Sequence, residues 1–284
     1  MTYRDLLKEG IGFLQGGTSP ELDARCLLLH ASGLTEVDLH RNPEKSVPIP
    51  IFRRFRRFLR RRADGCPVAY IVGKKYFWKD EFRVGRGVLI PRPETELIVE
   101  SVLRLRSPET RRIADLGTGS GNIVLSLARE LLDVEFFGVE RSRRALNYAI
   151  KNRGRLAVPN VRFLMGSWFQ PFADHGWGDF DFILSNPPYV SAADWKKLEK
   201  GIRHFEPRPA LLPGESGLEA LSLIVHRSPE FLRRGGFLIV EIGYGQKKDV
   251  LSLFDGRWNS VIVENDLNDI PRILIAQKKA TSSI

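Results

Sequence analysis

A buried strand, a glycine-rich loop and a helix follow one another in the middle of the chain, and this order constrains the fold more than any other feature. The run from Ile113 to Leu116 has the composition of a buried strand, and residues 123–129 carry apolar side chains at helical spacing. The loop between them contains Gly117, Gly119 and Gly121, whose lack of a side chain lets the backbone approach a ligand closely. Together they predict one strand and one helix of an open α/β sheet, with a ligand at the loop.

The glycine spacing and a later acidic residue indicate the kind of ligand. A dinucleotide fingerprint requires G-x-G-x-x-G, whereas this loop reads G-x-G-x-G and has Asn122 in place of the last glycine. A second apolar run, residues 134–139, leads to Glu140, roughly 20 residues past the loop, where a carboxylate can accept from both ribose hydroxyls. An acid that ends a strand is, by itself, more often a solvated charge or a helix cap. In this order, the elements favour a nucleoside ligand over NAD.

A third apolar run, residues 180–185, ends at the tetrapeptide Asn186-Pro187-Pro188-Tyr189. Two prolines in four residues usually mark only a turn. Here, however, they follow a strand whose carboxyl end should lie at the ligand-binding edge. Asn186 Oδ1 and the Pro187 carbonyl can each accept one N–H of a planar amino group, while the Tyr189 ring covers its face. We therefore predict a pocket for an NH2 group on an sp2 carbon, which either an amide or a nucleobase provides.

The remaining patterns divide the chain into regions. Residues 1–75 have helical patterning, and residues 76–90 contain short aromatic and β-branched runs separated by glycines, including a strand candidate at residues 88–90. We predict a helical N-terminal domain at residues 1–75, a linking β-hairpin at residues 76–90 and a third region at residues 91–284. In this third region strands and helices alternate, which predicts a mostly parallel sheet with helices on both faces. Within it, residues 190–216 look like a long irregular stretch beside a substrate cleft.

The chain is strongly basic. Its formal net charge is +10 over 284 residues, which suits work on nucleic acid or near the ribosome. Seven of its arginines lie between Arg53 and Arg62, interleaved with apolar side chains at helical spacing. A solvated helix face is the simpler interpretation of this pattern, and a surface for an acidic partner is the alternative.

Few residues suggest other chemistry. Cys26 and Cys66 are the only cysteines and form no C-x-x-C pair, and the five histidines have neither metal-ligand nor triad spacing, so we expect no metal site and assign the histidines no catalytic role. The N-terminus lacks an apolar leader, and no run approaches the roughly 18 apolar residues that span a bilayer, so we expect a cytoplasmic protein.

Several motifs together resemble one family. They are the glycine loop, the tetrapeptide at residues 186–189, the run Pro67 to Gly73, the run Leu89 to Glu96, and two C-terminal runs, Glu241 to Tyr244 and Asn268 to Arg272. With the helical N-terminal region, the chain resembles the bacterial release-factor glutamine N5-methyltransferases of the HemK/PrmC type over nearly its whole length. The tetrapeptide occurs in several nitrogen methyltransferases, whereas the Leu89 to Glu96 run is much more discriminating.

The resemblance implies a fold, a reaction and a set of site residues. The fold is a Rossmann-like class I S-adenosylmethionine-dependent methyltransferase with a seven-stranded, mostly parallel sheet. The reaction is methylation of the glutamine in the Gly-Gly-Gln motif of peptide chain release factors, by a monomer that does not require nucleic acid, although weak nonspecific binding to it is compatible with the charge. The implied S-adenosylmethionine contacts are Gly117, Thr118, Gly119, Ser120, Gly121, Glu140, Trp168 and Asn186. The implied substrate contacts are Asn186, Pro187, Pro188 and Tyr189, of which Asn186, Pro187 and Tyr189 are assigned to catalysis.

Two positions depart from the family pattern. Ser167 stands where an Asp often precedes the Trp, and Gly245 stands where an Asp is common. The first departure weakens the expectation of a carboxylate contact to the adenine amino group.

Three other functions stay open. A ribosomal protein glutamine is a related substrate, and an exocyclic amino group of adenine or guanine in nucleic acid offers the same planar NH2. A non-catalytic protein that binds S-adenosylmethionine or the ribosome is a third possibility, against which the complete set of motifs argues.

Overall fold

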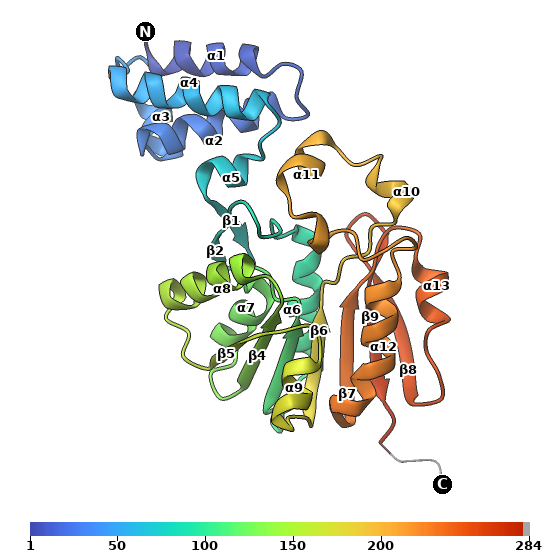
Figure 1. The fold of residues 1–284 in the computed structure, drawn as a ribbon. Helices are drawn as coiled ribbons and strands as arrows, with labels where there is room; N and C mark the ends of the chain where they lie inside the picture. The colour runs from blue at the N-terminus through green and yellow to red at the C-terminus, as the bar shows by residue number, and fades with distance from the viewer. Residues whose placement is uncertain (281–284) are drawn as a thin grey trace. The chain divides into compact units, whose positions relative to one another are not determined.

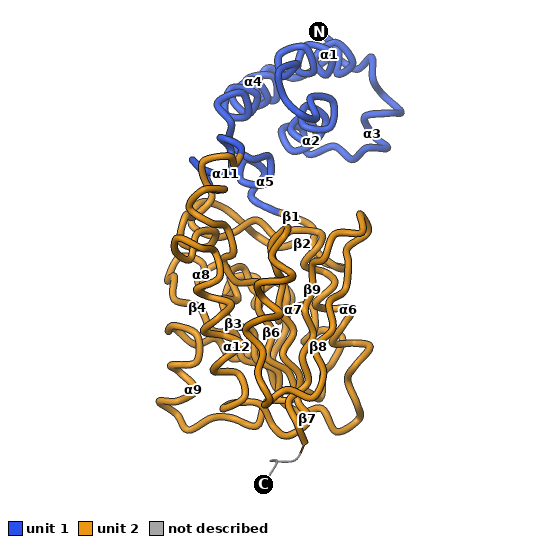
Figure 2. The backbone as a smooth tube through the Cα atoms, turned by 90° about the vertical axis from the view of Figure 1, so that its right-hand side faces the viewer, with its two compact units in different colours: residues 1–74, 199–205 blue, residues 75–198, 206–284 orange. Residues whose placement is uncertain are grey.

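The computed structural model describes residues 1–280 and divides into two compact units. One unit contains Met1–Lys74 and Glu199–Phe205, and the other contains Lys75–Leu198 and Glu206–Ile284 (Figure 2). The last residues of the region expected at 91–284, residues 281–284, lie outside the described part.

The first unit is helical, as the patterning predicts. Thr2 and Asp5 form a capping box at the start of its first helix, and Thr35 and Asp38 form another at the third. Pro20 occupies the first turn of the second helix, and Gly33 ends that helix in the left-handed conformation. The helices are α1 (Tyr3–Phe13), α2 (Pro20–Ser32), α3 (Glu36–Arg41), α4 (Ile49–Ala63), α5 (Val68–Val72) and α11 (Lys200–Phe205).

The arginine-rich segment forms the predicted amphipathic helix, α4. Phe55, Phe58 and Leu59 are buried, and α4 packs against α1 and α2. Arg53, Arg57 and Arg60 project from its exposed side. The apolar stripe thus supplies the core of this unit, while most of the charge faces solvent.

The predicted hairpin forms, but it is shorter and begins earlier than expected. Its strands are β1 (Lys74–Phe77) and β2 (Asp80–Arg83). The strand expected at residues 88–90 is wrong. Gly87 has a φ of 97°, and the Ile90 N–H donates to Glu206 Oε2 (3.1 Å) instead of to a strand ladder. This segment forms part of a cavity wall instead.

The second unit is built on a seven-stranded sheet in the order β5-β4-β3-β6-β7-β9-β8 (Figure 1). The first five strands in this order, β5, β4, β3, β6 and β7, pair in parallel, whereas β9 pairs antiparallel with both β7 and β8. The strands are β3 (Arg112–Leu116), β4 (Glu135–Glu140), β5 (Val161–Met165), β6 (Phe180–Ser185), β7 (Leu232–Glu241), β8 (Trp258–Asn265) and β9 (Pro271–Lys278). The predicted mostly parallel α/β sheet is therefore confirmed.

Helices cover both faces of this sheet, because successive side chains of each strand point to opposite faces. Along β6, Phe182 and Leu184 join the cluster formed with α6 and α7, whereas Ile183 joins the cluster formed with α9 and α12. The helices of this unit are α6 (Glu96–Leu105), α7 (Asn122–Glu130), α8 (Arg143–Leu156), α9 (Gln170–His175), α10 (Ala192–Trp195), α12 (Glu219–Phe231) and α13 (Lys247–Leu251), with 3-10 turns η1 (Pro93–Thr95) and η2 (Arg208–Ala210).

The strand order places a topological switch between β3 and β6. From β3 the chain builds outward through β4 and β5, then returns to the other side of β3 with β6 and continues with β7. Ligands of open α/β sheets bind in the crevice outside the carboxyl ends of the strands at such a point. Both the glycine loop after β3 and the tetrapeptide after β6 lie there.

Candidate active site

A cavity opens at the carboxyl end of the sheet in the second unit. Its empty volume is about 1000 Å³, including the open solvent at its mouth. Segments at the carboxyl ends of four parallel strands contribute to its wall: residues 117–120 after β3, residues 139–142 at and after the end of β4, residues 166–168 after β5, and Asn186 and Pro188 after β6. The strand order thus brings together segments that are far apart in the sequence.

Two further segments complete the wall. One contributes Gly87, Val88, Leu89, Pro91 and Arg92, and the other contributes Pro207, Pro209 and Ala210. The buried Glu206 connects them, since it accepts from the Ile90 N–H and pairs with Arg92 at 2.5 Å. Arg141 also donates to the Pro209 carbonyl at 2.9 Å. The irregular stretch predicted after the tetrapeptide therefore supplies part of the cavity, although it also contains short helices.

The glycine loop is held in a conformation that side chains disfavour. Gly117, Gly119 and Gly121 have φ values of 73°, 59° and 80°. The Gly117 and Thr118 N–H groups donate to the Val139 carbonyl at 2.9 and 3.0 Å, and these hydrogen bonds fix the loop to β4. Gly117, Thr118, Gly119 and Ser120 line the cavity, whereas Gly121 is the N-cap of α7, where a β-carbon would lie 2.8 Å from Leu125 Cδ1.

Glu140 ends β4 with only 8% of its surface exposed, and it lines the cavity. Its Oε2 accepts from the Gly119 N–H at 3.0 Å, and its Oε1 accepts from the Ser142 N–H at 2.7 Å. A carboxylate has about four lone-pair sites, so each oxygen can accept another hydrogen bond. Two backbone donors therefore orient the Glu140 carboxylate, and both of its oxygens keep the capacity to accept.

Asp115, in β3, is an acid of this region that the sequence did not single out. It is fully buried, and Thr118 Oγ1 donates to its Oδ2 at 2.6 Å. Burial raises the pKa of its carboxyl to about 7, with a smaller contribution from the charge of Glu140. The only sequence signal was an acidic residue within an otherwise apolar strand.

Trp168 lies in the loop after β5 with a positive φ of 49°, and its side chain lines the cavity. The neighbouring Ser167 also lines it. Gly245, the other departure from the family pattern, has a φ of 78°, which glycine adopts without the strain of a side chain.

The tetrapeptide divides between the cavity and a buried hydrogen-bond network. Asn186 and Pro188 line the cavity, whereas Pro187 and Tyr189 are not among its lining residues. Asn186 Nδ2 donates to Thr95 Oγ1 at 2.9 Å, and the Tyr189 hydroxyl donates to Glu241 Oε1 at 3.0 Å. The Asn186 amide and the Tyr189 hydroxyl are thus each held by a hydrogen bond to another side chain.

Three residues of this network were missed as site residues, namely Thr95, Glu241 and Gln246. Thr95 donates to Glu241 Oε2 at 2.6 Å, and Gln246 Nε2 donates to the Tyr189 carbonyl at 2.9 Å. Thr95 and Glu241 lie inside runs that carry the family resemblance, which was the available signal. Burial raises the pKa of the Glu241 carboxyl, although the hydroxyls of Thr95 and Tyr189 and the charge of Arg272 oppose this. Burial and then the Glu241 carboxylate raise the pKa of the Tyr189 phenol, which favours its donor form.

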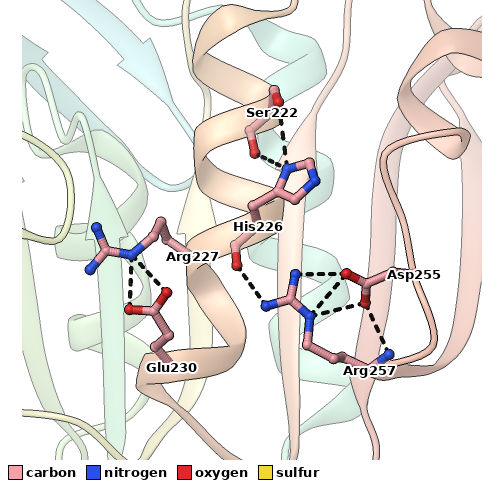
Figure 3. Close-up of polar contacts among 6 residues, drawn as sticks. All are labelled: Ser222, His226, Arg227, Glu230, Asp255 and Arg257. Atoms are coloured by element: carbon pink, nitrogen blue, oxygen red, sulfur yellow. Dashed lines mark hydrogen bonds and ion pairs between the residues drawn. The ribbon is translucent and has the colours of Figure 1, made fainter.

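None of the five histidines lines this cavity. His226, on α12, instead contacts the Ser222 carbonyl through its Nδ1 at 2.7 Å, in a surface group that also contains Arg257 (Figure 3). Within residues 1–280, no cluster of three or more His, Cys, Asp or Glu side chains is arranged to hold a metal ion. In the same range, no helix has the length and apolar character needed to cross a membrane.

Comparison with known proteins identifies the class and the family. Residues 5–73 match the PrmC N-terminal domain, and residues 109–240 match a methyltransferase domain. A solved 16S rRNA methyltransferase of T. Thermophilus, in complex with AdoMet and guanosine, is similar in fold, with a TM-score of 0.51 and 20% identity over 72% of this chain and 50% of that one. The chain is therefore a class I methyltransferase, and its predicted fold class is confirmed.

Curated relatives match over nearly the whole chain. The release factor glutamine methyltransferase of Vibrio cholerae is 38% identical over 98% of this chain and 98% of its own length. That of Escherichia coli (strain K12) is 37% identical over 89% of this chain and 90% of its own length. This chain belongs to the release factor glutamine methyltransferase family. The methyltransferase domain and the fold support S-adenosylmethionine as its cofactor.

Proposed function

We propose that this enzyme transfers a methyl group from S-adenosylmethionine to the side-chain amide nitrogen of the glutamine in the Gly-Gly-Gln motif of peptide chain release factors. The names of the full-length relatives support the substrate. One observation supports the chemistry most directly: the glycine loop, Glu140 and Asn186 come from three strands and line one cavity at the switch point.

The cavity residues fit this cofactor. Glu140 offers acceptors for ribose hydroxyls, the loop from Gly117 to Ser120 allows close approach of the backbone, and Trp168 offers an aromatic face for adenine. When bound, the cofactor supplies a methyl group on a positively charged sulfur, which is a good leaving group. The residues of this chain therefore need to hold donor and acceptor in line, and positioning supplies much of the rate.

The acceptor nitrogen is a poor nucleophile because the lone pair of an amide is delocalised into its carbonyl. Asn186 Oδ1 and the Pro187 carbonyl accept the two N–H groups of the glutamine amide, which stabilises the positive charge that grows on nitrogen in the transition state. Pro188 and Tyr189 complete the substrate contacts. Of these four residues, Asn186, Pro187 and Tyr189 take part in catalysis.

The remaining regions have supporting roles in this proposal. Residues 1–75 recognise the release factor, residues 76–90 link the domains and residues 91–284 carry out methyl transfer. The match of residues 5–73 to the PrmC N-terminal domain supports this division. The enzyme works in the cytoplasm as a monomer and requires no nucleic acid.

The test is a comparison of acceptors. The purified chain is incubated with labelled S-adenosylmethionine and, in separate reactions, a release factor, a ribosomal protein mixture, DNA or RNA. We expect label on the release factor and its loss when the motif glutamine is replaced by asparagine. Label on the ribosomal proteins or on a nucleic acid, with none on the release factor, would replace this proposal with one of the alternative substrates.

A further inference from the structure

The Asn186 amide is held by a two-step hydrogen-bond relay at the wall of the cavity, which both Asn186 and Thr95 line. Asn186 Nδ2 donates to Thr95 Oγ1 at 2.9 Å, and Thr95 Oγ1 donates to Glu241 Oε2 at 2.6 Å. Only 1% of the surface of Thr95 and of Glu241 is exposed, so water does not compete for these groups. The three residues come from the loop after β6, from η1 and from the end of β7.

The direction of this relay determines which end of the amide faces Thr95. When Glu241 is ionised, its carboxylate can only accept, so the single proton of the Thr95 hydroxyl points to Glu241. The short 2.6 Å separation is typical of such a charge-assisted bond. The Thr95 oxygen can then only accept, and its partner on Asn186 has to be the NH2 group. A flipped amide would place two acceptors against each other, so Oδ1 is directed away from Thr95.

Glu241 also fixes the other end of the tetrapeptide. Its Oε1 accepts from the Tyr189 hydroxyl at 3.0 Å, so its two oxygens are connected to Asn186 through Thr95 and to Tyr189 directly. The parallel pairing of β6 and β7, in which Ser185 lies beside Val240, puts Glu241 next to the start of the tetrapeptide. One buried carboxylate thus defines the position of both residues.

We propose that Thr95 and Glu241 are positioning residues that hold the Asn186 amide with its Oδ1 free to accept from the reacting amide. They act through Asn186 and Tyr189. This inference rests on the proposed methyl transfer to a glutamine amide, in which an acceptor is required at that position.

Thr95 offers a matched pair of variants. Thr95→Val keeps the shape of the side chain but removes the hydroxyl, whereas Thr95→Ser keeps the hydroxyl. We expect Thr95→Val to lower kcat by about 10- to 100-fold, the equivalent of one buried hydrogen bond to a charged network, with little change in cofactor affinity. Thr95→Ser should retain most of the activity. Equal kcat values for Thr95→Val and Thr95→Ser, in folded proteins, would overturn the inference.

The pH profile tests Glu241 separately. A protonated Glu241 can donate to Thr95, and the Thr95 proton is then free to be donated to Asn186 Oδ1. The amide orientation with Nδ2 toward Thr95 is then no longer favoured over the flipped one. The charged and titratable groups around it are Arg272 on β9, Glu94 in η1 and the Tyr189 phenol. We expect kcat of the wild type to fall as the pH is lowered through the Glu241 pKa. In Glu241→Gln, kcat should be low and this acid limb should be absent, whereas an unchanged limb would contradict the relay.

A measurement without substrate separates this inference from the proposed function. The side-chain NH2 resonances of Asn186, assigned in 15N-labelled protein through their loss in Asn186→Ala, report its hydrogen bonding. They should shift in Thr95→Val and stay near the wild-type positions in Thr95→Ser. Unshifted resonances in Thr95→Val would overturn the relay even if release factors are the substrate. Conversely, a wild type that fails to label a release factor would refute the proposed substrate and leave the NMR result intact.

Discussion

The buried Asp115 makes a prediction about stability that can be worked out from its surroundings. Its pKa is raised from an ordinary value of 3.8 to about 7, and burial is the main cause. The folded state therefore binds a proton that the unfolded state has released between about pH 4 and pH 7. The free energy of unfolding falls as the pH rises through this window, and the full penalty is present above about pH 7.

The size of the effect follows from the same values. At about 1.36 kcal/mol per pH unit, the wild type loses about 4 kcal/mol of unfolding free energy across this window. Asp115→Asn is neutral at every pH and can still accept from Thr118 through its side-chain oxygen. Relative to the wild type, it should therefore gain about 4 kcal/mol of unfolding free energy between pH 4 and pH 8.

Urea denaturation of both proteins across this range, without cofactor, measures the difference directly. Titrating groups that do not interact with Asp115 change both proteins alike and cancel in the difference. If the stability difference between Asp115→Asn and the wild type does not vary with pH, Asp115 does not titrate in this window and the explanation from burial is refuted.

Three further substitutions test the cofactor site, the glycine loop and the surface. Glu140→Ala should weaken S-adenosylmethionine binding by roughly 1.5 to 3 kcal/mol, because a charge-assisted ribose contact is lost, and unchanged affinity by calorimetry would count against that role. Gly121→Ala should lower the free energy of unfolding by at least about 1 to 2 kcal/mol, because a β-carbon there meets Leu125 at a φ of 80°. Its control, Gly154→Ala in α8, has open space around the new methyl group and should be neutral or stabilising, so similar losses in both would refute the steric argument. Arg257→Ala removes an exposed pair with Asp255 (Figure 3) and should change stability by less than about 1 kcal/mol, and a larger loss in urea denaturation would show that the surface group contributes to the fold.

Local patterns predicted the elements that depend on local physics. The apolar run at residues 180–185 coincides with β6, and the glycine loop lies between β3 and α7 as expected. Such elements are encoded by periodicity and by glycine positions. The expected strand at residues 88–90 failed because its backbone bonds to Glu206, a residue more than a hundred positions away.

The hydrogen-bond network around Asn186 could not be predicted from sequence patterns either, because it also joins residues that are far apart in the sequence. Thr95 lies 91 positions from Asn186 and 146 from Glu241. The register of β6 and β7 places Asn186 near Glu241, and the packing of α6, which follows Thr95 directly, against β7 adds the third residue. Tyr189 illustrates the limit further. Its ring was expected over a substrate face, and the hydrogen bond that fixes its hydroxyl to Glu241 had no local signal.

The proposed reaction is tested by the position of the transferred methyl group and by its dependence on Asn186. A release factor is incubated with S-adenosylmethionine and either the wild type or Asn186→Ala, whose folding is first confirmed by circular dichroism and urea denaturation. Peptide mapping by mass spectrometry then locates the methyl group. We expect a single methyl group on the side-chain nitrogen of the Gly-Gly-Gln glutamine with the wild type and almost none with Asn186→Ala. A methyl group on another residue, or undiminished turnover by the folded variant, would contradict it.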